Sequence, residues 1–262
     1  MIIYLKELKQ SFKSLCIWTL AISTMLVICI FMFPEIKNEM DEVSYVFANM
    51  GNFTDAFGMD KLNFGEIMGF YGIECGNILS IGGGLFAALI GISVLANEEK
   101  DRTAEFLLTN PINRSEVIIE KFLSIITQII IMNVFIVLVS ILSFTIIGED
   151  ISLKEFLLLH VSYLILQIEI SCICFGISAF IKGGSIGIGI GISIILYFLN
   201  IICNISEKAE FLRYITPFAY SEASDIILNS KLDLKLIIIG ILISIIFVFI
   251  GFIKYSRKDI AS

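Results

Sequence analysis

The sequence predicts an all-α membrane protein with six transmembrane helices, an N-terminal amphipathic interfacial helix, and both termini in the cytoplasm. Hydrophobic residues make up 57% of the 262 residues and charged residues only 16%, whereas a soluble domain carries roughly a quarter charged residues. The apolar residues also come in blocks of about 20, the length that a helix needs to cross a hydrocarbon core about 30 Å thick. These blocks recur along the whole chain, so residues 1–262 are predicted to form a single membrane domain.

Residues 1–14 predict a helix that lies at the membrane surface. Apolar side chains recur at helical spacing on one face, and lysine side chains occupy the other. A basic face of this kind binds the anionic headgroups of lipids. The apolar face carries Leu5, Leu8 and Phe12, and the basic face carries Lys6, Lys9 and Lys13.

Six apolar runs follow, and each predicts one span: residues 16–33, 78–96, 122–147, 156–180, 186–203 and 234–252. The first span is expected to end at Pro34, because proline disrupts the hydrogen bonding of a helix interior. Residues 34–77 and 204–233 are predicted to be outer loops, the second of them aromatic and dipping toward the headgroups. Residues 97–121 are predicted to be a cytoplasmic loop.

The distribution of lysine and arginine sets the orientation. With the N-terminus inside, the inner segments hold 11 of these 18 residues and the outer segments, which are longer in total, hold 7. Because basic residues concentrate on the cytoplasmic side of a membrane, both termini are predicted to be cytoplasmic. The absence of a basic stripe argues against nucleic acid as a partner.

The cytoplasmic loop carries the most specific pattern in the chain. Residues 103–108 are expected to be helical, and Pro111 to break that helix before the next one begins. The resulting elbow presents an apolar trio to the cytosol, which favours a docking surface over a solvated connector. The trio consists of Phe106, Leu107 and Leu108.

This loop resembles a known family. The pattern Glu99-x-x-x-Thr103-x-Glu105-Phe-Leu-Leu-x-x-Pro111-Ile112-x-Arg114 is similar to the first cytoplasmic loop of ABC-2 type transporter permeases. The resemblance extends to the N-terminal helix, both outer loops and the C-terminal tail, although Arg102 stands where the family often has glycine. By this resemblance, coupling to an ATP-binding subunit is assigned to Glu99, Arg102, Thr103, Glu105, Phe106, Leu107, Leu108, Pro111 and Arg114.

The resemblance implies an exporter in the cytoplasmic membrane of a bacterium, working as a homodimer or a heterodimer with a second permease. ATP and Mg would bind to the separate ATP-binding subunit, with no cofactor in this chain. The sequence supports that division of labour independently, because it contains no G-x-x-x-x-G-K-[ST] loop to hold phosphates. A secondary transporter driven by an ion gradient and a membrane scaffold that transports nothing remain as alternatives.

Small residues predict close helix packing in two spans. Gly183, Gly187 and Gly191 are spaced four apart in and just before the fifth span, and Gly83 and Gly91 lie in the second. Small side chains at this interval let helix backbones approach each other, within one chain or between protomers. A phosphate-binding role is disfavoured, because no strand precedes these glycines. Under the resemblance, spans two and five would form much of the dimer contact and of the pathway.

Polar residues inside the predicted spans are the remaining candidates for function. Glu169 and Gln167 lie in the fourth span, and Gln128 and Asn133 in the third. A carboxylate at that depth usually faces a bundle interior or a wet cavity. Two interpretations stay open: a substrate or proton path, or a protonated Glu169 hydrogen-bonded to Gln128 or Asn133.

The single histidine, His160, argues against a metal site rich in histidine. It is expected to be an interfacial packing residue close to the outer end of the fourth span. Cys75 and Cys203 lie in segments that can approach the same membrane face. Unpaired packing is favoured for them over a disulfide.

Overall fold

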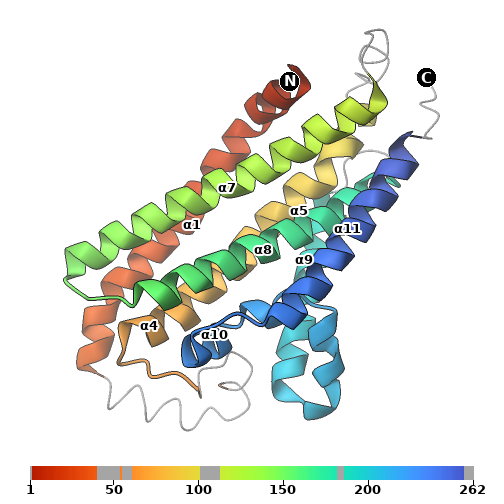
Figure 1. Ribbon diagram of the computed structural model, residues 1–262. Helices are drawn as coiled ribbons and strands as arrows, with labels where there is room; N and C mark the ends of the chain where they lie inside the picture. Colours follow the sequence, from red (N-terminus) through yellow and green to blue (C-terminus); the bar gives the residue numbers. More distant parts are fainter. Residues whose placement is uncertain (1, 40–53, 55–60, 101–112, 182–185, 257–262) are drawn as a thin grey trace.

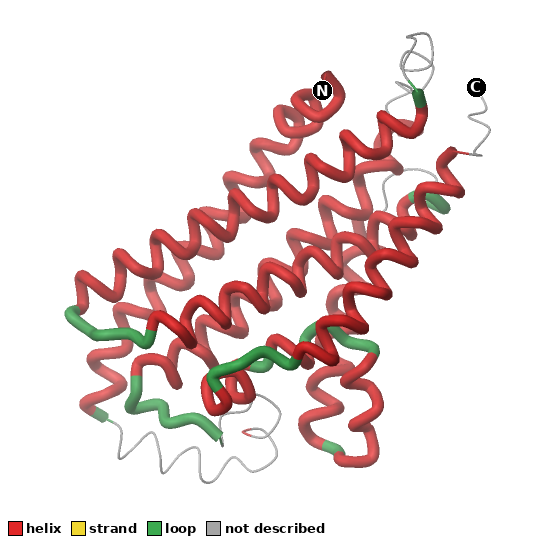
Figure 2. The backbone as a smooth tube through the Cα atoms, in the orientation of Figure 1, coloured by secondary structure: helices red, strands yellow, loops and turns green. Residues whose placement is uncertain are grey.

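Six long helices build the protein. The computed structural model describes residues 2–39, 54, 61–100, 113–181 and 186–256, with the side chains of residues 97–100 and 207 excepted, and these ranges contain helices and loops but no strand (Figures 1 and 2). Six helical segments in them are long and apolar enough to cross a membrane: Ile2–Asn38, Ile67–Ala96, Arg114–Ile147, Leu153–Ser178, Ile186–Ile205 and Leu234–Ser256. The predicted fold class, an all-α protein with six spans, is confirmed.

The first helix is longer than predicted. α1 (Ile2–Asn38) is one continuous helix that contains Pro34, so the predicted end at Pro34 is wrong, and no break separates the interfacial helix from the first span. Proline removes one backbone hydrogen bond, but the helix regains regular bonding beyond it: Glu39 N donates to Glu35 O and Ile36 O.

The second helix also begins earlier than predicted. α4 (Ile67–Phe70), the π-helical turn η1 (Tyr71–Cys75) and α5 (Gly76–Lys100) follow one another without a break. The last eleven residues of the predicted outer loop 34–77 are therefore helical. A π-turn adds one residue to the helical repeat, which rotates the side chains on either side of it relative to one another.

Three of the other four helices follow the predicted spans closely, whereas α7 begins eight residues before the predicted span 122–147, within the predicted cytoplasmic loop. The four are α7 (Arg114–Ile147), α8 (Leu153–Ser178), α9 (Ile186–Ile205) and α11 (Leu234–Ser256). α7 ends where predicted because Gly148 adopts a left-handed conformation, with φ 74°, and its N–H caps Phe144 O. Shorter helices, η2 (Glu207–Tyr214), η3 (Ala219–Ser221) and α10 (Ala223–Asn229), form a cap between α9 and α11.

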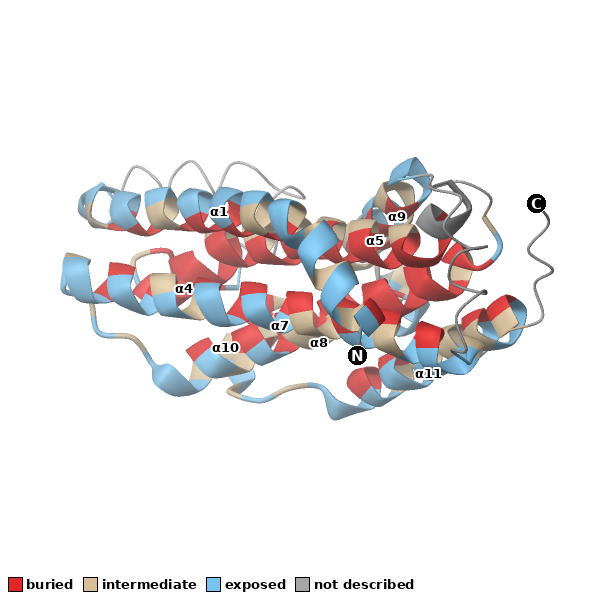
Figure 3. Ribbon diagram, turned by 90° about the horizontal axis from the view of Figure 1, so that it is seen from above, coloured by how far each residue is buried: buried red, intermediate tan, exposed pale blue. Residues whose placement is uncertain are grey.

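α5 and α8 lie at the centre of the bundle. α1 and α7 pack together on one side of them, α11 packs on α8, and α9 packs on α5 (Figures 1 and 3). In the apolar segments of α5 and α8, 67% of the residues are buried, against 22% in α9 and α11. The outward surfaces of α9 and α11 are apolar, as lipid-facing helices require.

The described ends of α1 and α11 that lie nearest the chain termini are at the same end of the bundle (Figure 1). α5 ends and α7 begins at this end too. We call it the predicted cytoplasmic end, and the opposite end, which carries the cap, the predicted outer end.

The glycines of the two predicted packing groups differ in their surroundings. A side chain at Gly83 would collide with the Gln167 amide, and one at Gly91 would lie 2.6 Å from Ser171 O, so both glycines let α5 approach α8. In α9, Gly189 packs on Ala88 and Ile92 of α5, whereas Gly187 and Gly191 face open space. No described part of the chain therefore packs on Gly187 or Gly191, for which packing between protomers stays a prediction, and Gly183 lies outside the described residues.

Replacing Gly91 with leucine is expected to lower the free energy of unfolding by about 1–3 kcal/mol, because an overpacked contact forces α5 away from α8. Gly191→Leu is the matched control, since a Cβ atom at this position has no atom of a described residue outside α9 within 4 Å. Thermal unfolding of both variants in detergent measures the difference. Equal stabilities would show that the α5–α8 contact tolerates a side chain.

Candidate functional site

The predicted cytoplasmic end holds both helices that flank the predicted coupling loop. Of the residues assigned to coupling, Arg102, Thr103, Glu105, Phe106, Leu107, Leu108 and Pro111 and the side chain of Glu99 lie outside the described residues. Arg114 is described: it opens α7, and its Nη1 donates a hydrogen bond of 3.3 Å to Ser256 O at the end of α11. Asn113 precedes it as the N-cap in an extended conformation, without a hydrogen bond from its side chain to the helix.

Lys121 joins three helices at this end. Its ammonium is 2% exposed and donates to Glu7 Oε1 of α1 at 2.5 Å and to Val94 O of α5 at 3.0 Å. Lys121 itself stands on α7, seven residues, or about 10 Å, from the helix start. A buried ammonium is tolerated only when it is paired and hydrogen-bonded. This contact therefore fixes α5 and α7, the two helices next to the coupling segment, to α1 and to each other.

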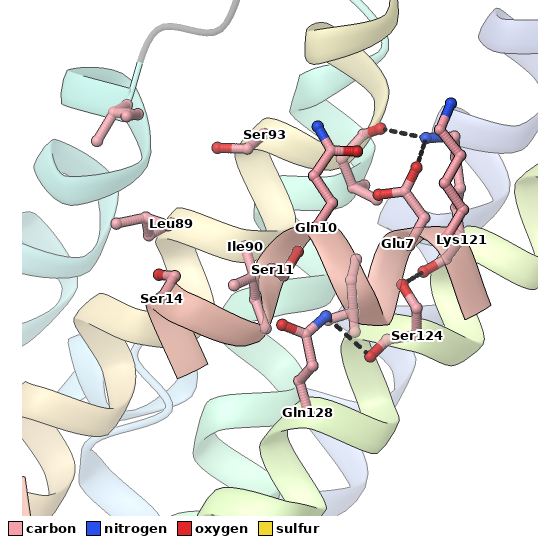
Figure 4. Close-up of a pocket in the computed structure, with 14 residues that line it drawn as sticks. Glu7, Gln10, Ser11, Ser14, Leu89, Ile90, Ser93, Lys121, Ser124 and Gln128 are labelled. Carbon is pink, nitrogen blue, oxygen red and sulfur yellow. Dashed lines mark hydrogen bonds and ion pairs between the residues drawn. The ribbon is translucent and has the colours of Figure 1, made fainter. Parts of the chain in front are cut away.

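A cavity of about 300 Å³ lies beside this contact. Residues of α1, α5 and α7 form most of its lining (Figure 4), and Ile186 of α9 also contributes to it. One part of the lining is polar and the other is apolar. The lining residues are Lys6, Glu7, Gln10, Ser11, Ser14, Leu89, Ile90, Ser93, Val94, Lys121, Ser124, Ile125, Gln128 and Ile186.

The other intramembrane polar residues fall into separate groups. Asn133 Nδ2 of α7 donates to Gln167 Oε1 of α8 at 2.6 Å, and both side chains are buried. Gln128 Nε2 donates instead to Ser124 O of its own helix at 3.1 Å and lines the cavity. The structure thus brings Asn133 and Gln167 together and leaves Gln128 apart from them.

Glu169 has a different partner from the one predicted. Its Oε2 accepts a hydrogen bond of 2.8 Å from the hydroxyl of Tyr220 in the cap, and its carboxyl group packs against Gly240 of α11. The predicted hydrogen bond to Gln128 or Asn133 is therefore wrong. Residues two apart on a helix point about 200° away from each other, so Gln167 faces α7 while Glu169 faces α11 and the cap.

The cap is tied to α9 by a second carboxylate, which the sequence did not single out. Glu222 Oε2 accepts hydrogen bonds from Asn200 Nδ2 at 3.2 Å and Asn204 Nδ2 at 3.1 Å. Burial raises the pKa of Glu222, and the two amides partly oppose that rise. Its neighbour Asp225 pairs with Arg213 at 2.8 Å.

His160 is a packing residue, but it lies inside the bundle and not at the membrane interface where it was predicted. It is 5% exposed, its Nε2 lies 2.9 Å from the hydroxyl of Tyr71, and its ring stacks edge-on against Phe156. Cys75 and Cys203 are both free thiols, and Cys203 Sγ donates to Ala209 O at 3.3 Å. Among the described residues, no three His, Cys, Asp or Glu side chains form a group that could hold a metal ion.

Lys121→Met is expected to destabilise the predicted cytoplasmic end. The variant leaves Glu7 without its ammonium partner and Val94 O without one of its donors, and the lost charge-assisted bonds correspond to about 1–3 kcal/mol. Hydrogen exchange at the ends of α5 and α7, followed by mass spectrometry, measures the local loss. The double variant with Glu7→Gln should lose less than the two single variants together, and strict additivity would contradict the pairing.

The comparisons with known proteins agree with this architecture. The family described as "ABC-2 family transporter protein" matches residues 1–260. None of the curated proteins compared with the chain matches it.

Proposed function

We propose a function from the premise that the chain belongs to the ABC-2 family of transporter proteins. The chain is a multi-pass membrane protein with six helices, a permease of that family. In the proposal, it is the transmembrane subunit of an exporter in a bacterial cytoplasmic membrane. Substrate crosses by alternating access, and a separate ATP-binding subunit, which holds ATP and Mg, hydrolyses the ATP.

The contact made by Lys121 is the observation that carries the coupling part of this proposal. Helices α5 and α7 flank the segment 101–112, which would meet the ATP-binding subunit. A push on that segment would move both helices together, because Lys121 on α7 binds Val94 O of α5 and Glu7 of α1. Rigid elements joined by buried polar contacts transmit such displacements better than separately mobile helices do.

The position of the cavity supports export rather than import. The cavity lies at the predicted cytoplasmic end, between α1, α5 and α7. An exporter must admit its substrate from the cytoplasm or from the inner leaflet. A cavity at this end suits that first step.

The exposed glycines support the proposed dimer. Gly187 and Gly191 leave a strip on α9 that has no contact with the described part of the chain. In a membrane, strips of small residues favour close contact with another helix. α5, by contrast, is mostly buried within one chain, so α9 would supply more of a dimer contact than α5.

Replacement of Phe106, Leu107 and Leu108 by serine is expected to abolish co-purification of the ATP-binding subunit, because a few well-packed side chains near the centre of an interface carry most of its binding energy. The measurement is a pull-down of the complex together with its ATPase activity.

The matched control for this experiment is the triple alanine variant of Ile238, Ile241 and Leu242, three exposed apolar side chains of α11. The control should retain the ATP-binding subunit. Full retention by the serine variant would contradict the proposed docking, and transport without any ATPase partner would favour a secondary transporter.

Glu169→Gln is expected to lower the transport rate of the reconstituted complex about tenfold or more while leaving the amount of protein in the membrane unchanged. The amide still accepts a hydrogen bond from Tyr220, so the fold is preserved, but the ionisable group is lost. Tyr220→Phe is the control, because it removes the hydrogen bond and keeps the carboxyl group. Wild-type transport by Glu169→Gln would assign Glu169 a structural role only.

A further inference from the structure

We propose that the cavity at the predicted cytoplasmic end binds the phosphate headgroup of an anionic lipid from the inner leaflet. The proposal goes beyond transport, because it concerns binding by the chain alone. It rests on the unused hydrogen-bonding groups of the cavity, its charge, its depth and its apolar wall.

The polar wall holds groups that no other protein group satisfies. Within the described part of the chain, the hydroxyls of Ser11, Ser14 and Ser93 form no hydrogen bond, although all three line the cavity (Figure 4). Gln128 is 2% exposed, and its Oε1 is buried without a partner. Buried polar groups are nearly always satisfied in a folded protein, so the buried oxygen of Gln128 indicates that a hydrogen-bond donor occupies the cavity. The three serine hydroxyls are half-buried and can donate to an acceptor in the same space.

The charge of the lining favours an anion. Lys6 and Lys121 bring two cations and Glu7 brings one carboxylate. Lys121 and Glu7 neutralise each other at 2.5 Å, whereas Lys6 is exposed and forms no ion pair with another described residue. Serine hydroxyls and a lysine ammonium are the donors that commonly bind phosphate oxygens.

The depth of the cavity matches the boundary between headgroups and acyl chains. Gln128 lies seven residues beyond Lys121 on α7, which corresponds to about 10 Å along the helix. A helix of 34 residues is about 51 Å long, so a hydrocarbon core about 30 Å thick and centred on it would begin close to Lys121. The cavity therefore extends from the level of the lipid phosphate into the first part of the hydrocarbon.

The apolar wall argues for a lipid rather than free phosphate. Leu89, Ile90, Val94, Ile125 and Ile186 line the same cavity, which is partly open. Inorganic phosphate would gain nothing from such a surface, whereas an acyl chain gains by burying its methylene groups. Ile17 of α1 and Ile188 of α9 are exposed apolar side chains close in sequence to the lining residues Ser14 and Ile186. Such side chains can cover the remaining length of the acyl chain.

Trp18 provides a reporter for the test, since it is the single tryptophan of the protein and stands one helical turn beyond Ser14 on α1. The full-length chain, purified in an uncharged maltoside detergent without any ATP-binding subunit, is titrated with phosphatidic acid that carries brominated acyl chains. Brominated diacylglycerol with the same chains is the comparison, because it lacks only the phosphate. We expect half-maximal quenching of Trp18 at about a tenfold lower mole fraction of phosphatidic acid, the effect of one or two charge-assisted hydrogen bonds.

A pair of lysine variants separates the cavity from general attraction to anionic lipid. Lys6 and Lys13 are both exposed on α1, but only Lys6 lines the cavity. Lys6→Met should weaken binding of phosphatidic acid about tenfold, and Lys13→Met should change it less than about twofold. Ser93→Ala, which cannot disturb the helix, should also weaken it.

Three results would overturn the proposal. Equal quenching by the two brominated lipids would show that the phosphate is not recognised. Equal effects of Lys6→Met and Lys13→Met would reduce the binding to surface charge. Displacement of brominated phosphatidic acid by inorganic phosphate as effectively as by unlabelled phosphatidic acid would identify a site for the free anion. None of these measurements involves an ATP-binding subunit, so each result bears on lipid binding by this chain and not on the proposed transport function.

Discussion

The close approach of α8 to its neighbours, which glycine permits, is the constraint on which the rest of the bundle depends. Hydrocarbon offers no hydrogen bonds, so the polar side chains of a central helix must find partners inside the protein. Three polar side chains of α8 occupy the space that a glycine leaves: Tyr163 beside Gly76, Gln167 beside Gly83, and Glu169 beside Gly240. A larger residue at any of these glycines would push a polar group toward lipid or separate two helices. The order of the helices around α8 therefore follows from where small residues face it.

This arrangement explains why the middle of the bundle differs from its predicted cytoplasmic end. Toward the middle, Gln167 reaches Asn133 of α7, and Glu169 reaches Tyr220 of the cap, so α7, α8 and the cap are held by buried hydrogen bonds. At the predicted cytoplasmic end, the ammonium of Lys121 connects α1, α5 and α7, and Tyr4 of α1 adds two hydrogen bonds to α7. No described side chain fills the space beside that ammonium, which remains as the cavity. The buried polar contacts and the cavity thus lie at different depths of the bundle, and α7 takes part in both.

Hydropathy predicted the number of helices well and their ends and pairings less well. The length of an apolar run reports the thickness of the bilayer, but a helix continues as far as its hydrogen bonds do, which is why α1 passes Pro34 and the helix before α5 begins at Ile67. Lys121 was predicted to lie in a loop because a charge normally marks the end of a span, and only its partners on two other helices reveal its role. The partner of Glu169 depends on the rotation of α8 about its axis. A single sequence does not determine this rotation. Nothing in the pattern of residues 204–233 indicated that the Tyr220 side chain would point into the bundle.

The distribution of polar contacts also determines which helix is least constrained. α9 is fixed at its outer half, where Thr216 Oγ1 donates to Leu196 O and Asn200 and Asn204 donate to Glu222. Among the described residues, the first half of α9 has no side-chain hydrogen bond to another helix, and Gly189 packs there on Ala88 and Ile92 through apolar contact. Apolar contacts in a membrane slide more easily than buried ion pairs separate, because lipid replaces them at little cost. Since Ile186 at the start of α9 also borders the cavity, a tilt of α9 about its outer half would change the cavity opening while the Lys121 contact kept α1, α5 and α7 together.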